Sequence, residues 1–347
     1  MTGNTGNTGN TGNTGNTGNT GNAGLNGDLG GGWFIPDRGD FPFVMETEAG
    51  GARIRELRRA VFIRDETTGA KKKIRFRSAN VAAAPSVAFG DDNWSARWYA
   101  FRVLKAFAGK NWATTALHNQ LADILLGLDE PEDPAAPASP SRHEAELALL
   151  VAMARDERAA ALGEILAQDA EFITAFMEAL AMTPGSHPRT YRVLHIASLV
   201  GSFTALHFKD EFNRPRPSWE VPALLPPVPV PGHSSYPSGH ATQAQLMALC
   251  MEFVLGLVSP ALPAGDIAAL RATLDALARR IARNREIAGL HYRSDSQAGQ
   301  TLARAVFAVL SQCSGDAQTP ADYAIPAFAR AAIAAARREW DPAWGFP

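Results

Sequence analysis

The stretch HSSYPSGH, residues 233–240, places a hydroxyl, a glycine and an imidazole directly before a segment with the apolar spacing of a helix. The first turn of a helix directs unpaired N–H groups and the positive end of its dipole outward, so it binds anions well. The stretch therefore predicts a site for a phosphate-like oxyanion, formed by Ser238, the N–H of Gly239 and His240. An ordinary helix start with Ser238 as N-cap would leave the same pattern, so both interpretations stay open for this stretch.

Cations precede this stretch, in the segment FKDEFNRPRP, where a predicted helix ends. Because a proline disfavours helical backbone at the residue before it, Arg214 and Arg216 are expected to lie in extended chain. Lys209 stands directly after the predicted end of the helix at residue 208. A polar helix end, with cations at the negative end of the dipole, would explain this segment by itself.

A further imidazole follows in NREIAGLHYRSD, residues 284–295. Arg285 is expected in the last turn of a helix that stops at Gly289, a residue suited to the C′ position. Asp295 stands four residues after His291, close enough to accept a hydrogen bond from the ring nitrogen that the reaction does not use. An exposed histidine with a local ion pair would explain this segment alone.

The segments together supply three cations, a hydroxyl with a backbone N–H at a helix start, and two histidines. This set can hold an oxyanion with three negative charges and act on it from two opposite sides. In order and spacing the segments resemble the three-part signature of the superfamily of vanadate-dependent haloperoxidases and type 2 phosphatidic acid phosphatases. The matching motifs span about 90 residues and are Lys209-x6-Arg216-Pro217, Pro237-Ser238-Gly239-His240 and Arg285-x5-His291-x3-Asp295.

The resemblance implies a role for each matching residue. His291 would be the apical group, which forms a phosphohistidine in a phosphatase and binds vanadium in a haloperoxidase. His240 would be the acid/base on the opposite side, where it protonates a leaving alcohol or handles the proton of bound peroxide. The six-residue offset from the lysine selects Arg216 over Arg214, and Asn284 stands where the third motif often begins with serine. The groups expected to bind the oxyanion are Lys209, Arg216, Ser238, Gly239 and Arg285.

Two chemistries remain open, because vanadate mimics phosphate and the motifs are common to both. His233, YPSGHATQ and GLHYR-x-D resemble algal bromoperoxidases, in which a histidine at that place lies beside the halide site. Leu206 stands three residues before the lysine, where haloperoxidases usually carry a tryptophan. The favoured interpretation is a haloperoxidase with a vanadate cofactor that oxidises bromide or iodide with hydrogen peroxide and acts on an organic small molecule.

The alternative is a soluble acid phosphatase that hydrolyses phosphate monoesters through a phosphohistidine in the same pocket. A non-catalytic scaffold that binds phosphate is a third interpretation. The pair His240 and His291 argues against the scaffold, because anion binding alone needs only the cations and the amide.

Helical periodicity dominates from about Trp94 and predicts an all-α helical bundle of the haloperoxidase and acid phosphatase type. The proline-rich segment 210–240 interrupts the bundle, and an irregular loop of this length is commonly functional. The acidic, proline-rich stretch 129–141 is expected to be a linker. The predicted helices are 94–108, 112–128, 142–168, 169–182, 188–208, 241–259, 266–287, 294–313 and 320–339.

Three regions are expected along the chain. Residues 1–32 contain seven TGN repeats and a glycine-rich run with almost no apolar side chains, which predicts a disordered low-complexity tail. Residues 33–93 form an N-terminal extension in which alternating residues around DETTGA indicate a β-hairpin. Residues 94–347 form the helical catalytic domain.

Composition excludes several classes of protein. The 347 residues are 46% hydrophobic with a net charge of −2, which predicts a globular chain without a nucleic-acid partner. Cys250 and Cys313 lie in apolar helical patterns and are expected to be buried thiols. The sequence shows no signal peptide and no apolar run long enough for a membrane span, so a soluble, cytoplasmic protein is the default expectation. Homo-oligomerisation stays open.

Overall fold

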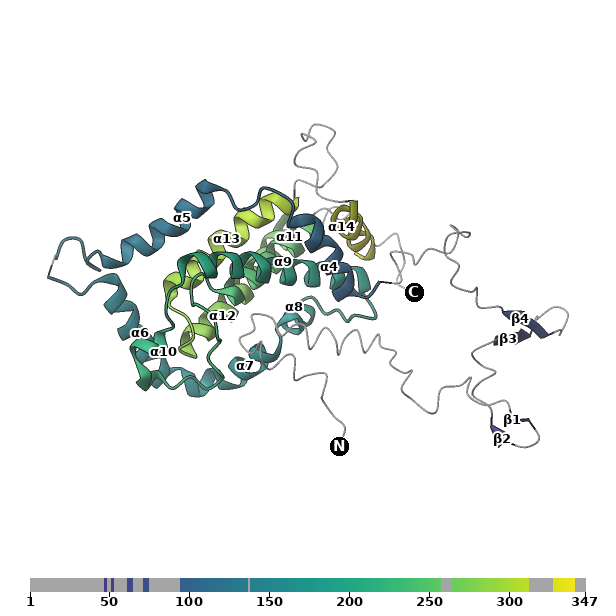
Figure 1. Cartoon of the computed structure of the whole chain (residues 1–347), viewed down its shortest axis with the longest axis horizontal. Helices are drawn as coiled ribbons and strands as arrows, with labels where there is room; N and C mark the ends of the chain where they lie inside the picture. The colour runs from purple at the N-terminus through teal and green to yellow at the C-terminus, as the bar shows by residue number, and fades with distance from the viewer. Residues whose placement is uncertain are drawn as a thin grey trace.

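The structure is a computed structural model, and it describes residues 47–48, 51–52, 61–64, 71–74, 94–136, 138–256, 264–311 and 327–340. From Trp94 onward the described residues form a helical bundle, which confirms the predicted all-α class (Figure 1). Its longer helices are α4 (Ala96–Phe107), α5 (Thr115–Leu126), α6 (Arg142–Asp156), α7 (Arg158–Ala170), α8 (Ile173–Ala179), α9 (Pro188–Phe212), α11 (Gly239–Leu255), α12 (Ala264–Ile287), α13 (Arg293–Ser311) and α14 (Ala327–Glu339). Short helices are η7 (Gly127–Asp129), α10 (Pro217–Glu220) and η8 (Pro222–Leu224).

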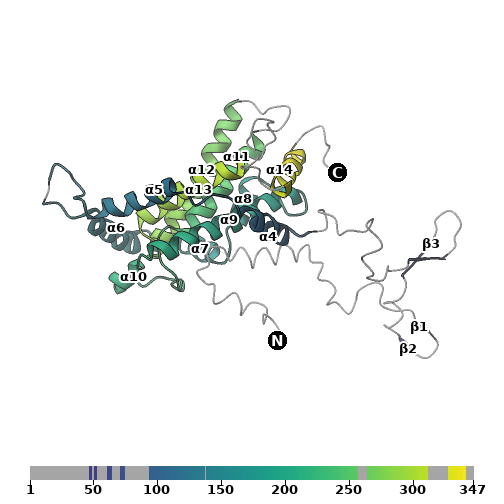
Figure 2. The same ribbon diagram turned by 45° about the horizontal axis from the view of Figure 1, so that its top comes forward.

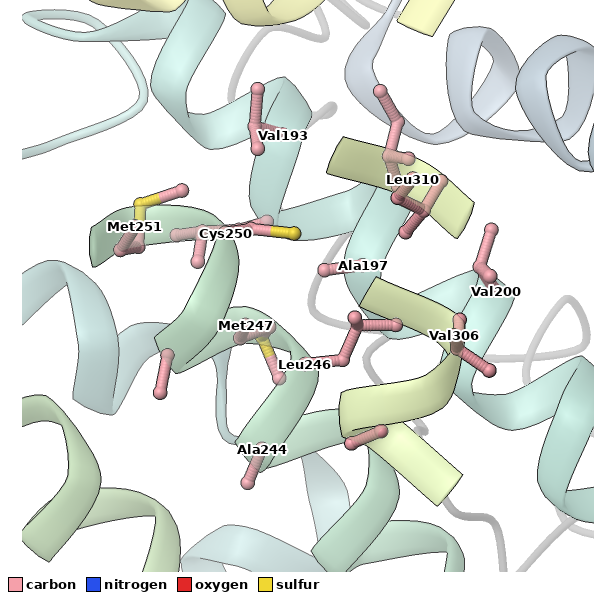
Figure 3. Close-up of a cluster of buried hydrophobic side chains, with 14 of the residues drawn as sticks. Val193, Ala197, Val200, Ala244, Leu246, Met247, Cys250, Met251, Val306 and Leu310 are labelled. Carbon is pink, nitrogen blue, oxygen red and sulfur yellow. The ribbon is translucent and has the colours of Figure 1, made fainter. Parts of the chain in front are cut away.

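Helix α11 is the central element of the bundle. It packs against α9, α12 and α13, while α4 and α14 pack on α9. Helices α5 and α6 lie at the end of the bundle away from α4 and α14 (Figures 1 and 2). Apolar side chains from α9, α11 and α13 interdigitate in the core between these helices, as Figure 3 shows for Ala197, Met247 and Val306. The thiol of Cys250 belongs to this core and is buried, as predicted.

Two glycines allow the helices to approach the start of α11 closely. A Cβ on Gly299 of α13 would lie 2.6 Å from the carbonyl oxygen of Ser238 and 2.9 Å from the Cβ of Ala241. A Cβ on Gly201 of α9 would lie 3.0 Å from the Cα of Gln243. Backbone contact on both sides therefore fixes the first turns of α11.

The predicted β-hairpin is present. Strand β3 (Val61–Arg64), before DETTGA in the sequence, pairs antiparallel with β4 (Lys71–Ile74), which follows it, and β1 (Thr47–Glu48) pairs with β2 (Gly51–Ala52). The second pair was not predicted. The predicted disordered tail, Cys313 and the first residues of the predicted helix 320–339 lie outside the described residues. The division of the chain at residues 33 and 94 stays a prediction.

The prediction of one helix over 142–168 is wrong, because the helix breaks at Glu157 into α6 and α7. The sequence shows no proline or glycine there, and the cause lies in distant contacts. The guanidinium of Arg158 donates to the carbonyl oxygens of Ile287, at 2.9 Å, and Leu224, at 2.6 Å. Glu157 itself pairs with Arg283 of α12. Tertiary contacts therefore override a continuous local helix propensity.

Helix α9 extends to Phe212, beyond the predicted end at residue 208, and stops where Asn213 adopts a left-handed conformation (φ 46°). The proline-rich segment after it is irregular except for α10 and η8, as expected. Among the helices of the described ranges, none is both long enough and apolar enough to cross a membrane.

Candidate active site

The end of α9 supplies the first cation of the site. Lys209 lies one turn before the end of α9, and its Nζ donates to the carbonyl oxygens of Ser234 and Ser235 at 2.8 and 2.7 Å. These bonds hold the lysine against the loop that leads into α11. Burial, followed by the charge of Arg216, lowers the pKa of Lys209 well below its ordinary value.

Arg216 follows in extended backbone, as the proline pattern predicts. Its Nε donates to the carbonyl oxygen of His233 at 3.0 Å, and one terminal nitrogen donates to the carbonyl oxygen of Leu290 at 2.8 Å. The same terminal nitrogen lies 3.2 Å from Nε2 of His291. Arg216 therefore connects the first motif to the third, although the two are far apart in the sequence.

Arg285 lies in the last turn of α12, which ends in a Schellman motif. Gly289 has φ +77°, and the N–H groups of Gly289 and Leu290 donate to the carbonyl oxygens of Glu286 and Arg285 at 2.8 and 3.0 Å. Only glycine adopts this left-handed conformation without strain, so the local sequence fixes where the helix stops. The chain then turns directly into His291.

The first turn of α11 carries the second motif. The Ser238 hydroxyl accepts a hydrogen bond from the N–H of Ala241 at 3.3 Å, which makes Ser238 the N-cap. The N-cap and anion-site interpretations are compatible, since the hydroxyl hydrogen can still donate to a bound oxyanion. Gly239 is the first helical residue. Nε2 of His240 lies 3.2 Å from the carbonyl oxygen of Gln168, and its ring lies against Phe172.

His291 and Asp295 form the predicted pair. Nδ1 of His291 lies 3.0 Å from Oδ2 of Asp295, and the N–H of Ser238 donates to the Asp295 carbonyl oxygen at 2.9 Å. Since the carboxylate accepts the proton of Nδ1, the lone pair on Nε2 points toward Arg216. Burial raises the pKa of Asp295, but the charge of Arg214 and the hydrogen bond from His291 outweigh it and lower that pKa to about 2.

The structure brings all the motif residues into one buried, positively charged cluster. Each of their side chains is at most 3% exposed: Lys209, Arg216, Ser238, His240, Arg285, His291 and Asp295. Burial and the neighbouring arginines lower the pKa values of His240 and His291 well below the ordinary value. Burial also lowers the pKa of Arg216 and of Arg285 to about 10 in each case. An oxyanion that enters this cluster would offset the repulsion between its cations.

The C-terminal end of α7 covers the cluster, and no feature of the sequence predicts this contact. Arg285 donates to a carboxylate oxygen of Asp169 at 3.2 Å and to the carbonyl oxygen of Ile165 at 2.6 Å. The side chain of Asn284 donates to Gln168 at 2.9 Å. Burial raises the pKa of Asp169, although the charge of Arg285 lowers it. An aspartate on an ordinary amphipathic helix carries no sequence signal that points to the site.

One buried nitrogen of the cluster is a donor that a bound anion would satisfy. Within the described part of the chain, Nε of Arg285 is buried and has no hydrogen-bond partner. A buried donor without a partner costs free energy comparable to a lost hydrogen bond, so a ligand that accepts from it is favoured. A tetrahedral oxyanion has oxygens to accept from this nitrogen. Phosphate and vanadate both meet this requirement.

The sequence connects two residues, His233 and Leu206, with halide binding, and they differ in their contacts and exposure. Nδ1 of His233 lies 3.1 Å from a terminal nitrogen of Arg216, so this histidine borders the cluster. Leu206 is 43% exposed on α9, whereas Lys209, three residues later, is 2% exposed. Position 206 therefore carries an aliphatic side chain that is far more exposed to solvent than the lysine one turn later.

Comparisons with known proteins agree with the motif pattern. Residues 191–318 match the family model of the PAP2 superfamily, which confirms the resemblance that the motifs predict. This segment contains every residue of the three motifs. No curated protein matches the chain.

One solved structure that matches is the crystal structure of the first transmembrane PAP2 type phosphatidylglycerolphosphate phosphatase from Bacillus subtilis. It is 16% identical, and the match covers 61% of this chain and 91% of that chain, with a TM-score of 0.28.

Proposed function

We propose that this protein is a phosphatase that hydrolyses phosphate monoesters through a phosphohistidine at His291. The observation that carries the proposal is the orientation of this side chain. Asp295 binds Nδ1, and Nε2 lies 3.2 Å from the guanidinium of Arg216. The nucleophilic lone pair therefore faces the group that would hold the phosphoryl oxygens, as in-line attack requires.

In the first step, Nε2 of His291 attacks phosphorus and the bond between phosphorus and the alcohol oxygen breaks. His240 donates its proton to the leaving oxygen, and the Nδ1 proton stays in its hydrogen bond to Asp295. In the protein without a bound anion, burial lowers the pKa of His240. The negative charge of a bound phosphate dianion would favour the protonated form of this histidine. Lys209, Arg216 and Arg285 stabilise the charge on the equatorial oxygens.

In the second step, water attacks the phosphohistidine and the bond between phosphorus and Nε2 breaks. His240 accepts a proton from this water, so the two steps restore the starting state. Inorganic phosphate then leaves. The buried cluster excludes bulk water from the charged groups, which strengthens their interaction with the transferred group.

A phosphatase is favoured over a haloperoxidase for two reasons. The matching family model is that of the PAP2 superfamily, whose name refers to a phosphatase. Leu206 occupies the position at which haloperoxidases usually carry a tryptophan, so no aromatic side chain is available there for a halide. The phosphatase is thus ranked first here, whereas His233 and its flanking residues alone favour the haloperoxidase.

A vanadate-dependent haloperoxidase is the second candidate, and the contact between His233 and Arg216 favours it. Vanadate would supply the activation of hydrogen peroxide for the oxidation of bromide or iodide. His291 would bind the vanadium, and His233 would place a hydrogen-bond donor beside the halide. The residues that would hold the vanadate oxygens are Lys209, Arg216, Ser238, Gly239 and Arg285.

A paired assay distinguishes the candidates. The metal-free protein is tested for hydrolysis of p-nitrophenyl phosphate, and the vanadate-loaded protein for peroxide-dependent bromination of a phenol. The proposal expects hydrolysis that vanadate inhibits competitively. Bromination without hydrolysis would establish the second candidate instead. Phosphate binding without either turnover would indicate a non-catalytic scaffold.

A further inference from the structure

Arg214 lies beside the cluster, but its contacts differ from those of the other arginines. One terminal nitrogen donates to Oδ1 of Asp295 and to Oγ of Ser294, both at 2.7 Å. The guanidinium carbon lies 3.6 Å from the centre of the Tyr292 ring. With 8% of its surface exposed, Arg214 is a buried partner of the third motif.

A second carboxylate holds Arg214 from the opposite side. Oε2 of Glu146 on α6 lies 3.4 Å from the other terminal nitrogen of Arg214 and accepts from the Ser294 hydroxyl at 2.7 Å. Oε1 of Glu146 accepts from the N–H of Ser294 at 2.6 Å. The guanidinium is thus fixed between Glu146 and Asp295, and it lies against the Tyr292 ring.

Asp295 divides its two carboxylate oxygens between separate partners. Oδ1 accepts from Arg214, whereas Oδ2 accepts from Nδ1 of His291 at 3.0 Å and from the N–H of Tyr292 at 3.1 Å. Asp295 is fully buried, and a buried carboxylate without a cationic partner is strongly destabilised. Arg214 therefore fixes both the charge and the plane of the group that orients His291.

We propose that Arg214 is a positioning residue that acts on His291 through Asp295, rather than a ligand of the oxyanion. The proposal rests on the assignment of His291 as the nucleophile. Without Arg214 the Asp295 carboxylate loses the partner of Oδ1 and can rotate, so the imidazole loses its orientation and its preference for the tautomer with a proton on Nδ1. Residues of this kind change turnover while ground-state binding of the anion is preserved.

The test compares Arg214→Ala and Arg214→Lys with Arg216→Ala as the matched control. In the hydrolysis of p-nitrophenyl phosphate, Arg214→Ala should lower kcat by about ten- to a hundredfold, the range for groups that orient an active residue. The KM and the inhibition constant of inorganic phosphate should change less than about threefold. Arg214→Lys should recover part of kcat. Arg216→Ala should instead weaken phosphate inhibition.

A double-mutant cycle with Asp295→Asn shows whether Arg214 acts through Asp295. If it does, adding Arg214→Ala to the Asp295→Asn variant should lower kcat little further, because the interaction is already lost. The double variant also removes both buried charges, so it remains informative if Arg214→Ala alone fails to fold. A full additional loss of kcat, or a rise in KM and in the phosphate inhibition constant at unchanged kcat, would overturn the proposal.

A spectroscopic measurement separates this proposal from the proposed function. Nitrogen-15 NMR of His291 in the anion-free protein should show the tautomer protonated at Nδ1 in the wild type and a mixture of tautomers in Arg214→Lys. This result would support the positioning role even if the wild type hydrolysed no phosphate ester, in which case the proposed function alone would fail. An unchanged tautomer in Arg214→Lys and Arg214→Ala would rule the positioning role out.

Discussion

At the scale of single residues, the site depends on which nitrogen of each histidine is engaged. Nδ1 of His291 is held by Asp295, whereas Nε2 of His240 lies against the Gln168 carbonyl oxygen. His291 therefore directs its Nε2 lone pair toward Arg216, and His240 must carry a proton on Nε2, because a carbonyl oxygen only accepts. The two imidazoles are therefore held by different nitrogens, which fits the proposed roles of His291 as nucleophile through Nε2 and of His240 as acid through Nδ1.

Replacement of His291 should separate chemistry from folding. His291→Ala removes the nucleophile but leaves the helices of the site in place, because their contacts run through the backbone and through Arg216. We expect less than a hundredth of the wild-type turnover, since loss of a covalent or acid/base group usually costs at least that factor. Circular dichroism should show unchanged helical content. Turnover above that level in a fully folded variant would exclude the assigned role.

At the scale of the helices, the start of α11 is placed by neighbours as much as by its own sequence. Ser238 as N-cap and Gly289 as C′ residue follow from local preferences, so the sequence predicts where α11 begins and α12 ends. Other contacts of the site are made between residues at least 72 positions apart. They are the contacts of α7 with the cluster and the ion pair between Arg214 and Asp295. No local pattern encodes such contacts, which is why the motifs were predictable and their surroundings were not.

Gly299 provides a direct test of this placement. In Gly299→Ala the added methyl group would lie 2.6 Å from the Ser238 carbonyl oxygen, so α13 must move away from the first turn of α11. We expect a loss of about 1–3 kcal/mol of stability, as for other overpacked sites, together with weaker phosphate inhibition because Ser238 and Gly239 shift. Urea unfolding and the inhibition constant measure the two effects.

The matched control is Gly163→Ala on α7. Among the described residues, and apart from its chain neighbours and the backbone of its own helix, no heavy atom lies within 4 Å of the position of its Cβ. Alanine is favoured over glycine inside a helix, so this variant should be stabilised by about 0.5–1 kcal/mol with unchanged inhibition. Equal responses from Gly299→Ala and Gly163→Ala would show that close packing at α11 does not position the anion site.

At the scale of the whole molecule, buried charges make stability depend on solution conditions. Glu286 on α12 is 6% exposed, and burial raises its pKa from 4.5 to about 7 despite the lowering effect of Arg283 and Arg293. Because the folded-state pKa is the higher one, the folded protein binds more protons than the unfolded chain between these values. The contribution of Glu286 to stability is therefore present below about pH 4.5 and is lost as the pH rises through 7.

Glu286→Gln should remove this loss, since glutamine is neutral at every pH. The variant should have the same free energy of unfolding as the wild type near pH 5. Near pH 8 its free energy of unfolding should be higher by up to about 3 kcal/mol, so it should unfold at a higher temperature. Thermal unfolding at the two pH values measures the difference. Glu178→Gln, at an exposed position of α8, is the control and should change neither value. A parallel pH dependence of Glu286→Gln and the wild type would contradict the role given to burial.

Because three cations are buried in one cluster, an anion that binds there would also stabilise the folded protein. Lys209, Arg216 and Arg285 are each at most 2% exposed, and burial lowers the pKa of each, so the protein without an anion pays the desolvation cost of three buried cations. A ligand that binds only the folded state adds about 2.7 kcal/mol of stability at a hundred times its dissociation constant. Phosphate should therefore raise the unfolding temperature by several degrees, whereas chloride at equal ionic strength should not, and Arg285→Ala should abolish most of the shift. If phosphate has this effect, thermodynamic linkage makes the folded fraction of the protein depend on the concentration of free phosphate, independently of any turnover.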